Sequence, residues 1–132
     1  PARAPAPAAE VLVVDDDENI RDLLRLQLTS AGYEVEVAAD AIVAGYRVLK
    51  SPPDLIITDV NMPHMDGFEF VAALRADATL PRIPVIFLTS AEDGDARGRD
   101  LGAVGYVLKP VRSDRLLSLV AQHVPGGAIP IG

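Results

Sequence analysis

The chain has 132 residues, 49% of them apolar, which is enough for one folded domain with its own hydrophobic core. Twelve basic and nineteen acidic residues give a formal net charge of −7, which argues against this chain binding nucleic acid by itself. Cysteine is absent, so disulfides and thiolate metal sites are excluded, and no apolar run reaches the ~20 residues of a membrane helix. We therefore expect a soluble protein without a membrane partner, in a reducing compartment such as the cytoplasm.

The two ends of the chain differ in composition from the middle. Residues 1–9 alternate proline and alanine, which is typical of an extended linker, and residues 125–132 have the glycine and proline content of a tail. The sequence starts with Pro1 and has no initiator methionine, so we expect a piece of a longer protein or a processed product. The folded domain is expected to occupy residues 10–124.

Within the domain, short apolar runs alternate with amphipathic segments. The run at 55–59 is continuously apolar until its last residues, which suits a strand buried on both faces of a parallel sheet. In 18–29, apolar residues recur at spacings of three and four, which predicts an amphipathic helix that Gly32 ends. Asp40 and Ser113 are placed to cap later helices. The predicted strands are 11–15, 33–38, 55–59, 85–89 and 106–108, and the predicted helices are 18–29, 41–49, 68–76, 94–101 and 113–124.

This alternation predicts an α/β fold in which five parallel strands form a doubly wound sheet with five helices and right-handed crossovers. Ligands of such sheets bind beyond the carboxyl ends of the strands. In this sequence those ends carry acids, a hydroxyl and a lysine, at Asp15, Asp16, Asp59, Thr89 and Lys109.

The residues at the strand ends predict a particular chemistry. Three carboxylates at one sheet edge repel one another unless a cation neutralises them, and Mg²⁺ with oxygen ligands is the simplest solution. Lys109 adds a point charge and Thr89 a hydroxyl donor. A cation, a lysine and a hydroxyl around the nucleophilic carboxylate of Asp59 predict phosphoryl transfer to that residue.

Four separated motifs carry a resemblance to a known family. They are VVDDD at 13–17, DVNMPHMDG at 59–67, LTSA at 88–91 and KP at 109–110. In this order they resemble the receiver domains of two-component response regulators, and the resemblance extends over residues 11–124. It implies a flavodoxin-like strand order of 2-1-3-4-5 and a cis peptide bond between Lys109 and Pro110.

The resemblance also implies roles for the acids. Asp59 would accept a phosphoryl group from a phosphohistidine of a sensor histidine kinase or a phosphotransfer protein. Asp16, Asp59 and the main-chain carbonyl of Asn61 would ligate Mg²⁺, and Asp15 would support the site. The aspartyl phosphate would hydrolyse without turnover of a separate substrate, so the protein is not expected to be an enzyme.

Three further residues receive roles in signalling from the resemblance. Lys109 would contact the phosphoryl oxygens, Thr89 would move toward them, and the aromatic ring of Tyr106 would follow Thr89 inward. The face formed by the fourth helix, the fifth strand and the fifth helix would then change, for an output domain or target protein that the sequence does not reveal. A phosphorylation-dependent homodimer is compatible with this, although Val104 and Val111 depart from the pattern of members with charged dimer contacts.

The fourth predicted helix is expected to be the least stable of the five. The segment 92–102 contains Gly94, Gly98 and Gly102, and a glycine inside a helix costs about 1 kcal/mol relative to alanine. On this basis Gly98→Ala is expected to strengthen the helix.

Other functions fit the sequence less well. A flavin or nucleotide binder of this fold would need a phosphate-binding loop after the first strand, where the acidic run 15–18 stands instead. A Mg²⁺-dependent phosphatase with an aspartyl nucleophile would need an acid where Asn61 lies. The remaining alternative is a degenerate receiver that acts as a phosphorylation-independent binding module, although such domains normally lack one of the acids or the lysine.

Overall fold

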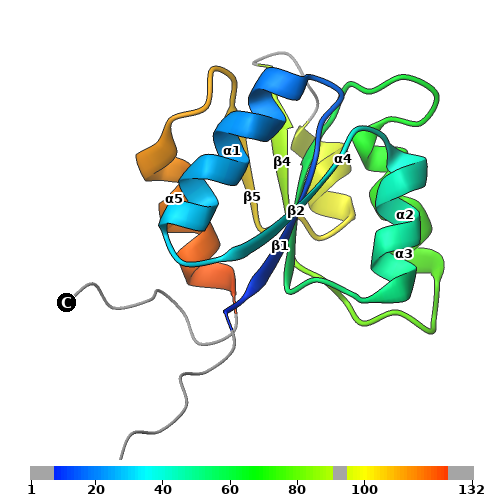
Figure 1. Cartoon of the computed structure of the whole chain (residues 1–132). Helices are drawn as coiled ribbons and strands as arrows, with labels where there is room; N and C mark the ends of the chain where they lie inside the picture. Colours follow the sequence, from blue (N-terminus) through cyan, green and yellow to red (C-terminus); the bar gives the residue numbers. More distant parts are fainter. Residues whose placement is uncertain (1–7, 91–94, 125–132) are drawn as a thin grey trace, which may run out of the picture.

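The computed structural model describes residues 8–90 and 95–124 (Figure 1). The predicted tail and residues 1–7 of the predicted linker lie outside the described residues, so both assignments stay predictions. The longest described helix has 13 residues, so no helix in this part of the chain could cross a membrane. The strands are β1 (Glu10–Val14), β2 (Glu34–Ala38), β3 (Leu55–Asp59), β4 (Val85–Thr89) and β5 (Gly105–Leu108), and the helices are α1 (Glu18–Ser30), α2 (Ala41–Lys50), α3 (Gly67–Ala76), α4 (Asp95–Asp100) and α5 (Ser113–His123).

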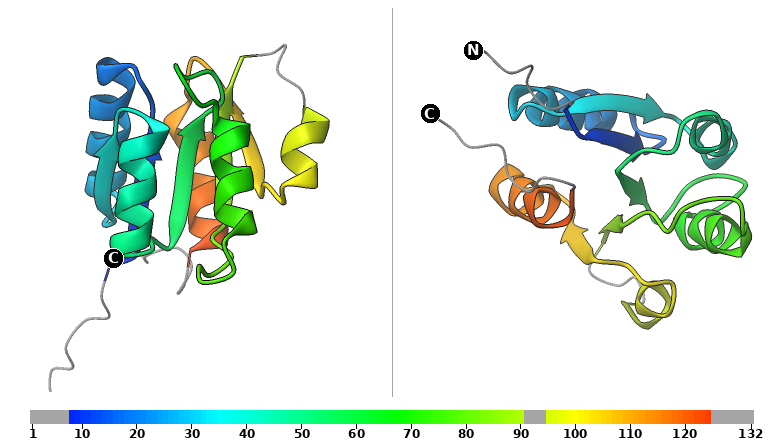
Figure 2. Two further views of the ribbon diagram at one scale, coloured as in Figure 1. Left: turned by 90° about the vertical axis from the view of Figure 1, so that its right-hand side faces the viewer. Right: turned by 90° about the horizontal axis from the view of Figure 1, so that it is seen from below.

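The five strands form one parallel sheet in the order β2-β1-β3-β4-β5, as predicted. Helices α1 and α5 cover one face of the sheet, and α2, α3 and α4 lie on the other (Figure 2). This is the doubly wound arrangement that right-handed crossovers produce. The switch in connection direction falls between β1 and β3, which opens a crevice at the carboxyl ends of these two strands.

Side-chain alternation along the central strands divides the core into two layers. Ile56 of β3 and Phe87 of β4 pack under α2 and α3, whereas Ile57 and Ile86 pack under α1 and α5. All five residues of β3 are buried because it is a central strand with helices on both faces. This burial on both faces explains why the sequence of β3 is an almost continuous apolar run.

Acidic side chains start three of the helices. Asp17 and Asp40 each accept a backbone hydrogen bond at the N-terminus of α1 and α2, and Asp66 forms a capping box at the start of α3. The last helix is present as predicted, but its cap is not: Ser113 is the first residue of α5, and Arg112 takes the cap position without a side-chain hydrogen bond.

Candidate functional site

The predicted site residues meet at the carboxyl edge of the sheet. The sequence predicted Asp15 as the last residue of the first strand, but β1 ends at Val14, so Asp15 follows the strand directly, and Asp59 is the last residue of β3. Thr89 ends β4, and Lys109 follows β5. Since these four strands are neighbours in the sheet, their ends place the four side chains around one crevice.

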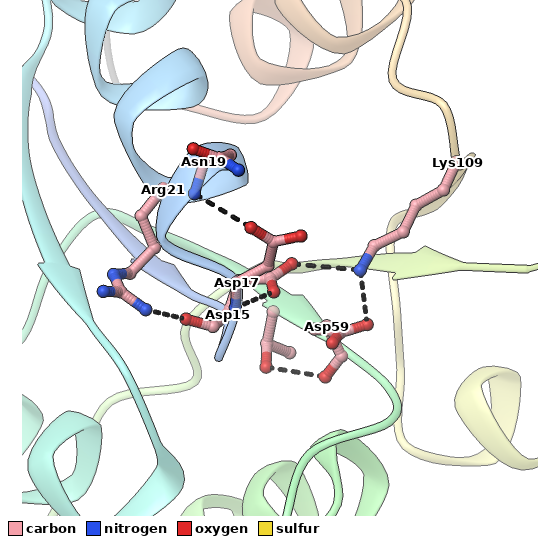
Figure 3. A network of polar contacts seen from close by, with 7 residues as sticks. Asp15, Asp17, Asn19, Arg21, Asp59 and Lys109 are labelled. Atoms are coloured by element: carbon pink, nitrogen blue, oxygen red, sulfur yellow. Dashed lines mark hydrogen bonds and ion pairs between the residues drawn. The ribbon is translucent and has the colours of Figure 1, made fainter.

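Lys109 joins two of the acids. Its Nζ lies 3.1 Å from Oδ2 of Asp15 and 3.1 Å from Oδ1 of Asp59 (Figure 3). Its backbone N–H donates to the carbonyl oxygen of Thr89 at 2.9 Å, and the peptide bond to Pro110 is cis, as the resemblance implied. The side chains of Asp15 and Asp59 are almost fully buried, so the ammonium group supplies most of the compensation for two carboxylates withdrawn from water.

Asp16 completes a group of three acids. One carboxylate oxygen from each of Asp15, Asp16 and Asp59 lies within 4.8 Å of the others, and Asp16 is exposed to solvent. Oδ2 of Asp15 is buried and accepts no hydrogen bond of good geometry from the described residues, so its partner there is the ion pair with Lys109. Three closely spaced carboxylate oxygens, one of them so poorly satisfied, are the donor set that a hard divalent cation prefers.

Burial and charge raise the pKa of Asp59 to about 6. Loss of solvation is the largest cause and the negative charge of Asp15 adds to it, while the hydrogen bond and charge of Lys109 act in the opposite direction. For Lys109, burial works to lower the pKa, but the hydrogen bonds and charges of Asp59 and Asp15 together outweigh it and raise the pKa above its usual value. The site therefore holds a basic, poorly solvated carboxylate beside a firmly protonated amine.

The backbone around Asp15 is held by contacts on the first turn of α1. Oδ1 of Asp15 accepts the backbone N–H of Asp17 at 2.9 Å, and the carbonyl oxygen of Asp15 accepts Nη1 of Arg21 at 2.8 Å (Figure 3). Sequence reasoning missed Arg21, because nothing in its spacing separates it from a surface arginine. Asp17 is the N-cap of α1, and its side chain accepts the backbone N–H of Asn19.

The loop after Asp59 depends on Gly67. A Cβ atom at Gly67 would collide with the carbonyl oxygen of Asp59, so α3 can start this close to the site only with glycine here. The backbone N–H of Gly67 donates to the carbonyl oxygen of Val60 at 2.8 Å and closes the loop. Asn61 lies in this loop and is exposed, and the role of its main-chain carbonyl as a metal ligand stays a prediction.

Thr89 and Tyr106 lie on adjacent strands next to the acids. Thr89 is buried, and its hydroxyl donates to the carbonyl oxygen of Ser90 at 3.0 Å. Tyr106 is half-buried on β5, directly opposite Phe87 of β4, and the two rings stack with centroids 5.9 Å apart. Phe87 in turn meets Phe68 of α3 edge to face at 4.9 Å. An aromatic row therefore crosses this side of the sheet from β5 to α3.

Comparisons with known proteins agree with this geometry. A family model described as the response regulator receiver domain matches residues 11–121. The DNA-binding dual master transcriptional regulator RpaA of Synechocystis is 37% identical over 112 residues, which are 83% of this chain and 46% of RpaA. Protein PilG of Pseudomonas aeruginosa is 33% identical over 119 residues, which are 88% of this chain and 87% of PilG. The solved structure of the chemotaxis response regulator CheY4 of Vibrio cholerae has a TM-score of 0.82 and 39% identity, and covers 89% of this chain and 99% of that one.

Proposed function

The chain belongs to the receiver domains of two-component response regulators, and on that premise we propose that Asp59 is its phosphoacceptor. The donor is a phosphohistidine of a sensor histidine kinase or a phosphotransfer protein. The observation that carries this proposal is the pairing of the buried Asp59 carboxylate with Lys109 at 3.1 Å, beside two further acids. The comparisons give no support to the alternative of a degenerate receiver.

Asp59 has the properties of a nucleophile. With a pKa of about 6, the carboxylate is ionised at neutral pH but more basic than an ordinary aspartate, and burial leaves it poorly solvated. One of its oxygens forms a bond to phosphorus as the bond between phosphorus and the donor imidazole nitrogen breaks. The product is an aspartyl phosphate, formed once per protein molecule, so we propose a stoichiometric acceptor and no enzyme acting on a separate substrate.

Lys109 and Thr89 are the groups that would meet the new phosphoryl oxygens. Nζ of Lys109 already contacts Oδ1 of Asp59, so a phosphoryl group on Asp59 lies within reach of its ammonium. Thr89 ends the neighbouring strand, and a turn of its hydroxyl away from Ser90 would bring a donor toward the same oxygens. Tyr106, on the next strand, would respond to that movement and pass it to α4, β5 and α5.

The acids are suited to a metal ion as well. Asp16 and Asp59, with the main-chain carbonyl of Asn61 and with Asp15 in support, would hold Mg²⁺. When bound, this ion supplies positive charge for the developing charge on the phosphoryl oxygens. The protein's own part is to place hard oxygen ligands and Lys109 on either side of the acceptor.

The output of the signal is not defined by this chain, which spans about half the length of RpaA and most of PilG. RpaA is a DNA-binding regulator, and we propose that an output domain or a separate target protein does the corresponding work here. With a formal net charge of −7, the domain itself is unsuited to direct contact with nucleic acid. A cytoplasmic location and a phosphorylation-dependent homodimer stay predictions.

The test is phosphorylation by a small-molecule donor such as acetyl phosphate in the presence of Mg²⁺. Intact-mass spectrometry should show one added phosphoryl group, labile in the manner of an acyl phosphate. Asp59→Asn should remove the added mass, because an amide is not nucleophilic. Asp22→Asn, at an exposed acid on α1, is the control and should label like the parent. Equal labelling of Asp59→Asn would refute the assignment.

A further inference from the structure

Arg21 reaches from the first turn of α1 back to the acidic end of β1. It is partly buried, and its Nη1 donates to the carbonyl oxygen of Asp15 at 2.8 Å. This carbonyl belongs to the peptide unit that joins Asp15 to Asp16. Because a peptide unit is planar, a hydrogen bond to its oxygen limits the direction in which the chain continues to the next residue. Arg21 therefore acts on the backbone between two of the three clustered acids.

Asp16 depends on this backbone more than the other two acids do. The carboxylates of Asp15 and Asp59 are held by Lys109, whose Nζ lies 3.1 Å from an oxygen of each. The side chain of Asp16 is exposed and forms no hydrogen bond or ion pair with the described residues, yet one of its oxygens lies within 4.8 Å of the other two acids. The place of the Asp16 carboxylate therefore follows from the peptide unit that precedes it.

Other hydrogen bonds hold the chain on both sides of this peptide unit. Before it, the backbone N–H of Asp15 donates to the carbonyl oxygen of Ala38 at 3.1 Å. After it, the backbone N–H of Asp17 donates to Oδ1 of Asp15 at 2.9 Å, and the carbonyl oxygen of Asp17 accepts the backbone N–H of Arg21 at 3.1 Å. Within the described residues, the carbonyl between Asp15 and Asp16 is bonded only by the side chain of Arg21.

The guanidinium group of Arg21 leaves the carboxylate oxygens to other partners. Arg21 and Lys109 reach Asp15 from opposite sides (Figure 3). Lys109 contacts the Asp15 carboxylate, whereas Arg21 donates to the uncharged carbonyl oxygen. Arg21 can therefore orient the acids without occupying the oxygens that a metal ion would take.

We propose that Arg21 is a positioning residue for the metal ion that the acids would hold. Its hydrogen bond keeps the peptide unit between Asp15 and Asp16 in the orientation that directs the Asp16 carboxylate toward the other two. Arg21 itself contacts neither the metal ion nor the phosphoryl group. This inference rests on the proposed Mg²⁺ site and adds to it a residue that lies outside the ligand set.

The test compares the Mg²⁺ affinity of two matched variants of the whole chain. Arg21→Met keeps an unbranched apolar stem and a similar helix propensity but cannot donate the hydrogen bond. Its dissociation constant for Mg²⁺, from an NMR titration of the metal-free protein, should rise roughly tenfold, which is typical for loss of a group that orients a metal ligand. Arg25→Met is the control, since Arg25 is exposed one turn further along α1 and its loss removes the same charge without affecting the bond to Asp15. It should bind Mg²⁺ like the parent.

The rate of labelling by acetyl phosphate separates positioning from a general loss of structure. Arg21→Met should need roughly tenfold more Mg²⁺ to reach half its maximal rate, in line with its weaker affinity. At saturating Mg²⁺ its rate should approach that of the parent, because Asp59 and Lys109 are unchanged. A lower maximal rate with an unchanged Mg²⁺ requirement would contradict the proposal.

The outcomes distinguish this inference from the metal site on which it rests. A parent that does not bind Mg²⁺ would refute the site itself. A parent that binds Mg²⁺, with an equal affinity in Arg21→Met or an equal loss in Arg25→Met, would refute only the role of Arg21. If Arg21→Met does not fold without metal, Arg21→Gln gives the same test, because its amide nitrogen ends two bonds closer to the backbone than Nη1 and the side chain remains polar.

Discussion

The ring of Tyr106 fills the space that a side chain at Gly98 would need. A Cβ atom at Gly98 would collide with the Tyr106 hydroxyl oxygen and would lie 2.7 Å from Cζ of the same ring. The Tyr106 ring also stacks on the ring of Phe87, with the two ring centroids 5.9 Å apart. Gly98 is therefore a contact surface for the predicted switch residue, in addition to being a weak helix former.

This contact corrects the sequence-based expectation that Gly98→Ala simply strengthens α4. The methyl group overlaps the Tyr106 ring where it now stands, so relieving the contact needs a rotation of the ring or a shift of α4. We expect the ring to leave its stack on Phe87, with a changed aromatic signal in near-ultraviolet circular dichroism or NMR. The free energy of unfolding should then fail to rise by the ~1 kcal/mol that helix propensity alone would give.

Gly45→Ala is the matched control for this substitution. Gly45 is also inside a helix, but a Cβ atom there meets nothing within 4 Å, so alanine should stabilise the monomer by about 1 kcal/mol. The double variant Gly98→Ala with Tyr106→Leu should recover the stabilisation that the single change loses, because the bulky ring is gone. If Gly98→Ala alone stabilises as much as Gly45→Ala and leaves the aromatic signals unchanged, the contact has no energetic role.

A second prediction concerns the pH dependence of the metal-free protein. The pKa of Asp59 is raised from 3.8 to about 6 in the folded state, so the fold binds this proton more tightly than the unfolded chain does. Its contribution to stability is fully present below pH ~4 and is lost as pH rises through about 6. Asp59→Asn should flatten this part of the profile and stabilise the metal-free protein at pH 7, by about 1–3 kcal/mol. Denaturant unfolding at several pH values in the presence of a chelator is the measurement. A destabilised Asn variant would contradict the crowding of the acids.

A third prediction links Mg²⁺ to stability. A cation that binds the folded state raises the melting temperature, and the rise depends on its affinity for the three acids. Millimolar Mg²⁺ should therefore stabilise the parent against heat. Asp16→Asn should reduce the rise strongly, because it removes the exposed ligand without touching the Lys109 ion pairs. Asp22→Asn serves as the control for a lost surface charge, and a rise equal to that of the parent in Asp16→Asn would exclude Asp16 as a ligand.

The sequence predicted the parts of this molecule that local patterns determine. The parallel sheet and the place of Asp59 at its carboxyl edge followed from the alternation of apolar runs and amphipathic segments, and the strand order was implied by the resemblance to receiver domains. The double ion pair of Lys109 and the bond from Arg21 to the Asp15 carbonyl were not predictable, because they depend on how side chains far apart in sequence meet. The role of Gly98 was misjudged for the same reason, since helix propensity is local and its contact with Tyr106 is not.

The last prediction is that phosphorylation at Asp59 changes the order or the position of α4. This helix has six residues and contains Gly98, so its own hydrogen bonds provide little stability. It is attached at its C-terminal end, where Nε of Arg75 donates to the carbonyl oxygen of Leu101 at 3.0 Å and Nη1 donates to that of Ile83 at 2.7 Å. A short, intrinsically weak helix next to Tyr106 is the element that a small movement at the site can shift most easily.

Amide hydrogen exchange across residues 95–104, with and without a phosphoryl mimic on Asp59, measures this directly. Exchange in the resting protein should be faster here than in α1, and the mimic should change it. Arg75→Gln removes the guanidinium group that donates to the carbonyl oxygens of Leu101 and Ile83. Amide exchange of the unmodified protein should therefore become faster in this segment and stay the same in α1. In Asp59→Asn, the mimic should leave amide exchange across residues 95–104 unchanged. This control distinguishes a change transmitted from Asp59 from a direct effect of the mimic on α4. Protection equal to that of α1, unaltered by the mimic, would show that the signal leaves the domain by another route.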